Sequence, residues 1–255
     1  NQRLPLAIVA TLPPERVIAN AALTAIRTLA DGRVGLTFEG FPTERIFDHV
    51  IVTVPFTVLR AIDTAKAGFD ERKRTAIDRL GYGANAKLIV QFKHRFWRGR
   101  GAWPGVGDGD TCTDLPYQST WDASRAQPAP FGLLADYVGE GQRVFGAPAP
   151  YSTSIGTPLV DGYARTFAQQ LEHVFPHAGS AYTGRAMLSQ PYADRHAGGS
   201  YSCWLPGQYT TIGGYERIRQ GNIHFAGEHT SQRFQGYMEG AAETGLLAAG
   251  EVLDA

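Results

Sequence analysis

The chain has 255 residues, and its 24 Lys and Arg residues balance its 24 Asp and Glu residues. A hydrophobic content of 43% and an aromatic content of 11% are typical of a globular protein with a full core and exclude a disordered chain. The zero net charge, without a basic stripe of interleaved aromatics, disfavours nucleic-acid binding. No apolar run is long enough to cross a bilayer, so no membrane span is predicted.

Two features bear on the compartment. Cys112 and Cys203 are too few for a disulfide framework, and two unpaired thiols are favoured over a single bridge. The N-terminus carries no signal peptide, but an export signal on a preceding segment would leave the same sequence. The chain is therefore compatible with a soluble protein that is either cytoplasmic or exported.

Helix and strand signals follow one another through the first part of the chain. Asp31-Gly32 is typical of a hairpin turn, and Asp70 is placed to cap a helix. The run 49–54 is nearly all β-branched, as in a strand buried on both faces. The predicted elements are a helix over 4–12, strands over 16–19, 23–28, 34–38 and 49–54, and helices over 56–62 and 70–80.

The middle of the chain has strands and one long helix around an aromatic-rich loop. Apolar spacing predicts strands over 86–92, 131–138 and 181–188 and a helix over 158–175. A loop as long as 93–130 is usually functional or held by short strands. It carries four aromatics, Phe96, Trp97, Trp103 and Trp121.

The tail of the chain, 222–255, combines a strand, a polar turn and a helix. Residues 223–226 predict a short strand, 227–235 a turn, and 237–253 a helix rich in Gly and Ala. Small side chains let a backbone approach a flat ligand closely, and a helix N-terminus can hold negative charge. The tail therefore predicts an anion or cofactor site, with an ordinary buried strand–helix unit as the alternative.

The tail closely resembles the C-terminal signature of the flavin amine oxidases, in which FAGEHT or a variant is followed by GYMEG. This family contains monoamine, polyamine and L-amino-acid oxidases. The resemblance implies that Glu228 contacts the ribityl or pyrophosphate region of FAD and that the Met238 backbone faces the flavin pyrimidine oxygen. Gly227, Gly236 and Tyr237 belong to the same cofactor-binding stretch. The tail helix would stabilise the negative charge of reduced flavin.

Residues 1–55 resemble the second FAD-domain segment of that family, in which a strand like HVIVTVP leads out into the substrate domain. The resemblance implies a backbone contact between Val17 and the adenine. An ordinary core valine is the alternative, because a backbone contact leaves no side-chain signature.

Lys87 is a lone lysine within the apolar strand AKLIVQF. A lysine in such a run costs free energy unless it is partnered or hydrated, and strand alternation favours a solvent-facing position. NAKLIVQF followed by FW is similar to the family segment in which a lysine holds a water against flavin N5. The resemblance therefore implies that Lys87 is a catalytic residue.

Tyr201 in GGSYSCWLPG and Tyr237 in QGYMEG match the two aromatics that flank the amine in monoamine and polyamine oxidases. Two ring faces make a flat apolar slot that favours a cation or a polarised nitrogen. The resemblance implies catalytic and substrate-binding roles for both, with Trp204 as the substitute for Tyr201; packed core tyrosines are the alternative. Ser200 stands where some members carry a cysteine bound to FAD, and Cys203 is displaced, so non-covalent FAD is expected.

The nucleotide fingerprint of the family, a strand followed by GxGxxG and a helix, is missing from the sequence. The near match at 81–86 follows a predicted helix and opens a strand, and 105–110 fails the spacing. The resemblance covers nearly all of this chain but only the C-terminal part of the family. We therefore expect an N-terminal FAD-binding partner, from a cleaved precursor or a separate subunit, unless the sequence itself is a shortened one.

Other chemistries fit less well. His173 and His177 are separated by a helix-breaking proline and have no third ligand, so no metal site is predicted. GGSYS is one glycine short of a nucleophile elbow. The run 228–230 could suggest acid–base work, but the family has no general base there, and hydride transfer from a neutral amine needs none.

Together these observations predict an α/β (mixed α+β) fold in two parts. Residues 1–55 and 196–255 would complete a Rossmann-like FAD-binding domain, and 56–195 a substrate domain with a mixed sheet flanked by helices. The resemblance implies oxidation of a primary or secondary amine by hydride transfer to FAD, with oxygen giving hydrogen peroxide and primary amines releasing ammonia. An L-amino-acid oxidase that yields a 2-oxo acid is one alternative, and a non-catalytic chain that completes its partner's fold is another.

Overall fold

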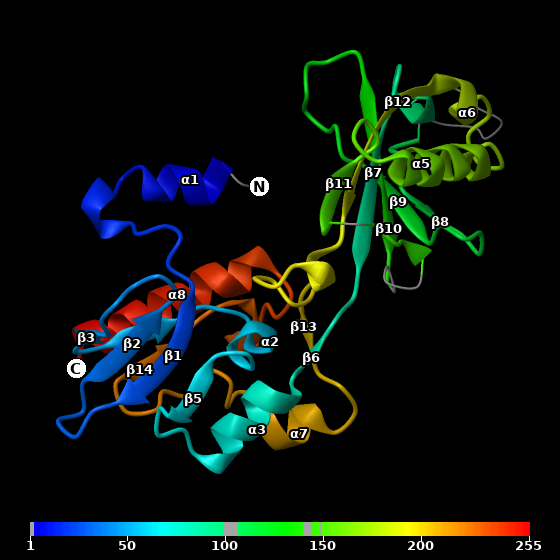
Figure 1. The fold of residues 1–255 in the computed structure, drawn as a ribbon. Coiled ribbons are helices and arrows are strands. Elements are labelled where there is room, and N and C mark those ends of the chain that lie inside the picture. The colour runs from blue at the N-terminus through cyan, green and yellow to red at the C-terminus, as the bar shows by residue number, and fades with distance from the viewer. Residues whose placement is uncertain (1–2, 99–106, 140–143, 148) are drawn as a thin grey trace.

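The computed structural model describes residues 3–98, 107–139, 144–147 and 149–255. Figure 1 shows two bodies joined by the outgoing strands β6 (Gly81–Tyr82) and β7 (Ala86–Phe92) and by a returning segment that contains β13 (Ser202–Cys203). We call the body that holds both ends of the chain the terminal body, residues 3–82 and 202–255. The central body comprises the described residues between 86 and 189. β6 and β13 pair antiparallel where the two bodies meet.

The terminal body contains a four-stranded sheet and a separate pair of parallel strands. The sheet has the order β3–β2–β1–β5, in which β1 runs antiparallel to β2 and parallel to β5. β4 and β14 form the parallel pair. The strands are β1 (Leu23–Thr28), β2 (Val34–Phe38), β3 (Arg45–Phe47), β4 (Val50–Val52), β5 (Asp63–Lys66) and β14 (Ile223–Phe225). The helices and 3-10 turns are α1 (Arg3–Val9), η1 (Pro14–Arg16), α2 (Phe56–Leu59), α3 (Glu71–Arg79), α7 (Gln208–Ile212), η4 (Glu228–Thr230) and α8 (Met238–Leu253).

One apolar cluster holds the terminal body together. Ile26 and Val34 enter it from the four-stranded sheet, and Phe56 meets Phe225 edge to face with ring centroids 6.2 Å apart. α2 and α3 contribute to the same cluster. Residues 56–80, which the sequence analysis assigned to the substrate domain, therefore pack with the two ends of the chain.

The central body is built on a six-stranded sheet of order β11–β12–β7–β10–β9–β8. All of its pairings are antiparallel, whereas a mixed sheet was predicted here. Antiparallel strands need only short connections, such as the one from β9 to β10, and no crossover helix. The strands are β7, β8 (Thr111–Cys112), β9 (Ser119–Asp122), β10 (Gly132–Val138), β11 (Tyr151–Thr153) and β12 (Tyr182–Ser189). The described helices and 3-10 turns between 86 and 201 include η2 (Phe96–Arg98), α5 (Pro158–Leu171), α6 (Ala178–Ala181) and η3 (Pro191–Ala193).

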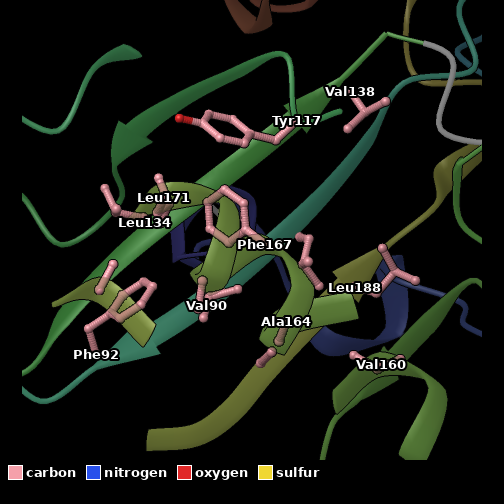
Figure 2. Close-up of a cluster of buried hydrophobic side chains, with 14 of the residues drawn as sticks. Val90, Phe92, Tyr117, Leu134, Val138, Val160, Ala164, Phe167, Leu171 and Leu188 are labelled. Carbon is pink, nitrogen blue, oxygen red and sulfur yellow. The ribbon is translucent and has the colours of Figure 1, made fainter. Parts of the chain in front are cut away.

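α5 covers one face of this sheet. Figure 2 shows Val90 and Leu134 of the sheet and Phe167 of the helix within one buried cluster. The burial of β7 alternates, so that Leu88 and Val90 face α5 and Lys87 points to the opposite, exposed face. The site described below lies on that exposed face.

The fold class is confirmed, and most predicted elements form close to their predicted bounds. The strand predicted over 16–19 is wrong, because Pro13 and Pro14 lead into η1 and the segment after it is exposed and has no strand partner in the described chain. The strand within 49–54 is shorter, and Ile51 is exposed rather than buried. Both cysteines are free, as favoured. Trp103 lies outside the described residues.

Across the ranges that the structure describes, none of the helices combines the length and apolarity needed to cross a membrane.

Candidate active site

The tail forms a glycine-dependent turn between β14 and α8. Gly227 has φ +131°, a conformation that favours glycine, and a Cβ there would lie 2.6 Å from the His229 ring. The Gly227 N–H donates to Thr244 Oγ1 at 2.9 Å, which ties the turn to the middle of α8. α8 begins at Met238 after Tyr237, and no described side chain caps this end. Its first N–H groups are therefore available to an external acceptor.

Glu228 clamps the two segments that carry the predicted tyrosines. Its Oε1 accepts a hydrogen bond from Ser202 N at 2.9 Å, and its Oε2 accepts from Ser202 Oγ at 2.8 Å and from Gly236 N at 2.7 Å. Ser202 directly follows Tyr201, and Gly236 directly precedes Tyr237. The carboxylate therefore fixes the backbone next to both tyrosines.

Lys87 lies beside two aromatic rings on the exposed face of the central sheet. Its Nζ is 5.7 Å from the ring centroid of Trp121 and 5.9 Å from that of Tyr137, and the two centroids are 5.5 Å apart. Tyr137 on β10 is the direct cross-strand partner of Lys87, and Trp121 is on β9. Ring faces attract an ammonium group, so the two rings hold the lysine at this face. We call Lys87, Trp121 and Tyr137 the lysine corner.

Tyr201 reaches the lysine corner from the returning segment. Its hydroxyl lies 2.8 Å from the Tyr137 hydroxyl. Its ring packs over Gly236, where an added Cβ would lie 3.5 Å from Tyr201 Cδ2. Its carbonyl accepts a hydrogen bond from Gly83 N at 2.9 Å. The fold thus brings Tyr201, Lys87 and the segment before α8 together from three distant parts of the sequence.

The other predicted residues have different surroundings. Tyr237 is 70% exposed at the start of α8. Trp204 donates its Nε1 hydrogen to Glu216 Oε1 at 2.7 Å and packs against Tyr209, so it is held within the terminal body and does not replace Tyr201 at the corner. Val17 follows η1 and is 41% exposed, so it lies outside the core of the described structure.

Ser200 and Cys203 agree with a non-covalent cofactor. Ser200 Oγ donates to Asn85 Oδ1 at 2.6 Å and so serves the local structure. Partial burial raises the pKa of the Cys203 thiol, and the nearby Glu228 charge raises it further. A thiol with a raised pKa is a poor nucleophile for a covalent link.

His229 faces the interior of the terminal body. Its ring centroid is 4.6 Å from that of Phe56. Burial, together with the nearby Lys73 charge, lowers the pKa of His229 to about 4, so the imidazole is neutral at physiological pH. This placement argues against acid–base work at 228–230.

Neither Trp121 nor Tyr137 was predicted as a site residue. Alternation along 131–138 places Tyr137 on the face opposite to Leu134 and Val138, which is a usable signal. It does not show which strand lies beside it. The pairing of β10 with β7 is a long-range property that no local pattern contains.

Comparison with known proteins shows the family to which the chain belongs. The family model described as flavin containing amine oxidoreductase matches residues 1–253. The chain belongs to this family. It is 44% identical over 216 residues to amine oxidase [flavin-containing] A of Equus caballus, covering 81% of this chain and 37% of that protein. It is 26% identical over 297 residues to an L-glutamate oxidase precursor of Streptomyces viridosporus, covering 93% of this chain and 43% of that protein.

The fold of this chain also matches solved structures. Cyclohexylamine oxidase from Brevibacterium oxydans superposes with a TM-score of 0.81 at 16% sequence identity, covering 99% of this chain and 52% of that one. The chain thus spans about half, or less, of the length of the proteins it matches.

The family comparison confirms the expected flavin cofactor, and the described residues fit the ring end of FAD. The uncapped start of α8 suits negative charge. Gly236, at φ +83°, lies just before the start of α8 and has no Cβ. The carboxylate of Glu228 already accepts three protein hydrogen bonds, so any contact with FAD would add to its role as a clamp.

Proposed function

We propose that this chain forms the substrate-facing, C-terminal part of an FAD-dependent oxidase that converts a primary or secondary amine to an imine or carbonyl. Oxygen would be the electron acceptor, and the products would include hydrogen peroxide and, from primary amines, ammonia. The observation that carries the proposal is the meeting of Tyr201 with the lysine corner, next to the segment that leads into α8. An aromatic ring, a cation and an available helix N-terminus suit an amine and an electron-accepting ring.

Non-covalently bound FAD would accept the hydride from the carbon that bears the amine. Tyr201 and Tyr237 would present ring faces to the amine and orient that carbon. Lys87 would hold a water next to the reacting position. The backbone at Gly227, Gly236 and Met238 would support the negative charge that develops on the cofactor.

The residues that bind the dinucleotide part of FAD would come from an N-terminal FAD-binding polypeptide. Exposed apolar side chains support such a partner, since Leu4, Ile8 and Ile18 are all more than half exposed in the described structure. Contiguous exposed apolar surface often marks an interaction site. The partner would cover α1, and the exposed Val17 would be within reach of the adenine.

The second candidate is an L-amino-acid oxidase, because an L-glutamate oxidase precursor is among the relatives. The two activities differ in one substrate group, the α-carboxylate. Matched pairs of an L-amino acid and the amine left when its carboxylate is removed therefore separate them. Suitable pairs are L-phenylalanine with phenethylamine and L-ornithine with putrescine.

The test begins with co-expression of the chain and an FAD-binding partner segment, followed by purification. A yellow complex that releases peroxide from the amines supports the proposal, and release from the amino acids alone supports the second candidate. A colourless chain that is stable by itself and gives no peroxide with either set would refute both. It would favour the remaining alternative, a non-catalytic chain that completes its partner's fold.

A further inference from the structure

We propose that Tyr137 is a positioning residue of the oxidase site, which holds the Tyr201 ring through its hydroxyl and Lys87 through its own ring. One side chain would then set both the amine-facing aromatic and the lysine. This inference rests on the proposed function and extends it to a residue outside every motif that the sequence analysis used.

The backbone of Tyr137 is well anchored. β10 lies inside the six-stranded sheet, and Tyr137 pairs with Lys87 on β7 and with Ser119 on β9. A residue paired on both sides in the middle of a sheet has little freedom to move. It is therefore a suitable reference point for groups that approach from elsewhere.

Tyr201 lies on a much less regular segment. Its backbone is held at two points, by Gly83 N on its carbonyl and by the Glu228 carboxylate on the next residue, Ser202. Its ring has Gly236 below it and the Tyr137 hydroxyl at its end. The hydroxyl pair is thus the polar contact that fixes the direction of the ring.

The chemistry of the pair suits a fixed, neutral contact. Burial raises the pKa of Tyr137, and the hydrogen bond with Tyr201 raises it further, so the phenol stays protonated. A neutral phenol can donate to or accept from Tyr201 without placing a negative charge beside Lys87. The face of its ring remains available to the ammonium group.

Two substitutions separate the two contacts in the FAD-loaded complex. Tyr137→Phe removes the hydroxyl and keeps the ring, so flavin reduction at saturating substrate should slow by about fivefold while the reaction with oxygen is unchanged. Tyr137→Leu also removes the ring from Lys87, so both half-reactions should slow. Stopped-flow absorbance under anaerobic and then aerobic conditions measures the two steps separately.

A double-mutant cycle tests the hydroxyl pair itself. If the hydroxyls act together, Tyr201→Phe combined with Tyr137→Phe should slow flavin reduction no more than either change alone. Tyr182→Phe is the matched control, because it removes a tyrosine hydroxyl of the same sheet that bonds to Asp161 at 2.9 Å, away from the site. Its rates should equal those of the unmodified chain.

The same double-mutant cycle can be measured on urea unfolding midpoints, which do not depend on turnover. This measurement distinguishes the positioning role of Tyr137 from the proposed function. Non-additive midpoints with no flavin reduction by any amine or amino acid would refute the proposed function and, with it, the positioning role. Normal turnover with additive effects in both measurements, or with an unaltered reduction rate in Tyr137→Phe, would overturn the role of Tyr137 alone.

Discussion

Lys87 shows how a residue that interrupts an apolar strand is accommodated. The alternation of β7 turns its side chain away from the core, and Trp121 and Tyr137 receive the ammonium group on the exposed face. The position is solvent-facing, as the pattern indicated. Its tyrosine neighbour is Tyr137, whose hydroxyl in turn meets that of Tyr201.

Replacement of Lys87 by methionine tests its chemical role. Lys87→Met keeps the length of the side chain and removes the charge, so we expect flavin reduction or reoxidation to slow on the order of tenfold or more while FAD stays bound. Lys93→Met is the control, because Lys93 is also exposed and its Nζ donates only to Ser180 O in the described structure. Rapid-mixing absorbance measures both steps, and unchanged rates of both would remove Lys87 from the mechanism.

Asp136 predicts a pH dependence of stability. It lies buried on the core-facing side of β10, and burial raises its pKa from 3.8 to about 7. The carboxyl is therefore protonated in the folded state over a range in which the unfolded chain ionises. Its stabilising effect is complete below about pH 4 and is lost as the pH rises to about 7, by roughly 3–4 kcal/mol.

The variant Asp136→Asn isolates this effect from other buried groups such as His229, whose depressed pKa acts in the opposite direction. The asparagine cannot ionise, so the unfolding free energy of the variant relative to the unmodified chain should increase between about pH 4 and about pH 8. Urea titrations at several pH values measure the difference. Asp114→Asn, at an exposed position, should show no such trend, and parallel curves for Asp136→Asn would contradict the prediction.

At the scale of the element, two glycines of α8, Gly240 and Gly245, have different surroundings. An added Cβ on Gly240 would lie 2.4 Å from Phe234 O and 2.9 Å from Ser231 Cβ, whereas on Gly245 it would meet no described atom within 4 Å. Gly240 is therefore needed for close packing at the first turn of the helix, but it packs against the loop before the helix and not against a ligand or a sheet. Close packing does not explain the glycine at Gly245.

A pair of alanine substitutions follows from this contrast. Gly245→Ala should raise the unfolding free energy by up to about 1 kcal/mol, because alanine favours the helix. Gly240→Ala should lower it by about 1–3 kcal/mol, since the backbone oxygen of Phe234 leaves no room. Chemical denaturation of the two variants checks the signs, and a gain in both would show that the turn before α8 yields easily.

These elements also show which parts of the fold the sequence could predict. β14, the Gly227 turn and α8 were predicted nearly to the residue, because their signals are local: an apolar run, a polar stretch that starts with a glycine, and a helix rich in Gly and Ala. The strand predicted over 16–19 failed, because strand propensity without a partner does not make a strand. Tyr137 was missed for the related reason that its neighbours come from pairing across the chain.

At the scale of the whole molecule, the two bodies differ in how much apolar surface they leave open. The central body buries its cluster between sheet and α5. In the terminal body, α1 stands away from the sheets in Figure 1, and none of its residues is buried. A short helix without tertiary packing is marginal in water. The exposed apolar side chains of α1 are therefore the surface that the proposed partner would cover.

Hydrogen exchange tests this completion directly. In the chain alone, the amides of α1 and of the segment through Val17 should exchange within seconds, whereas those of β7, paired on both sides, should be protected. A partner that covers α1 should slow exchange across α1 and leave β7 unchanged. Addition of FAD to that complex should further protect the segment near Val17 if its backbone meets the adenine. Deuterium uptake by mass spectrometry with chain, chain plus partner, and chain plus partner and FAD distinguishes these steps. Equal uptake in α1 with and without the partner would mean that the exposed apolar face is not its contact.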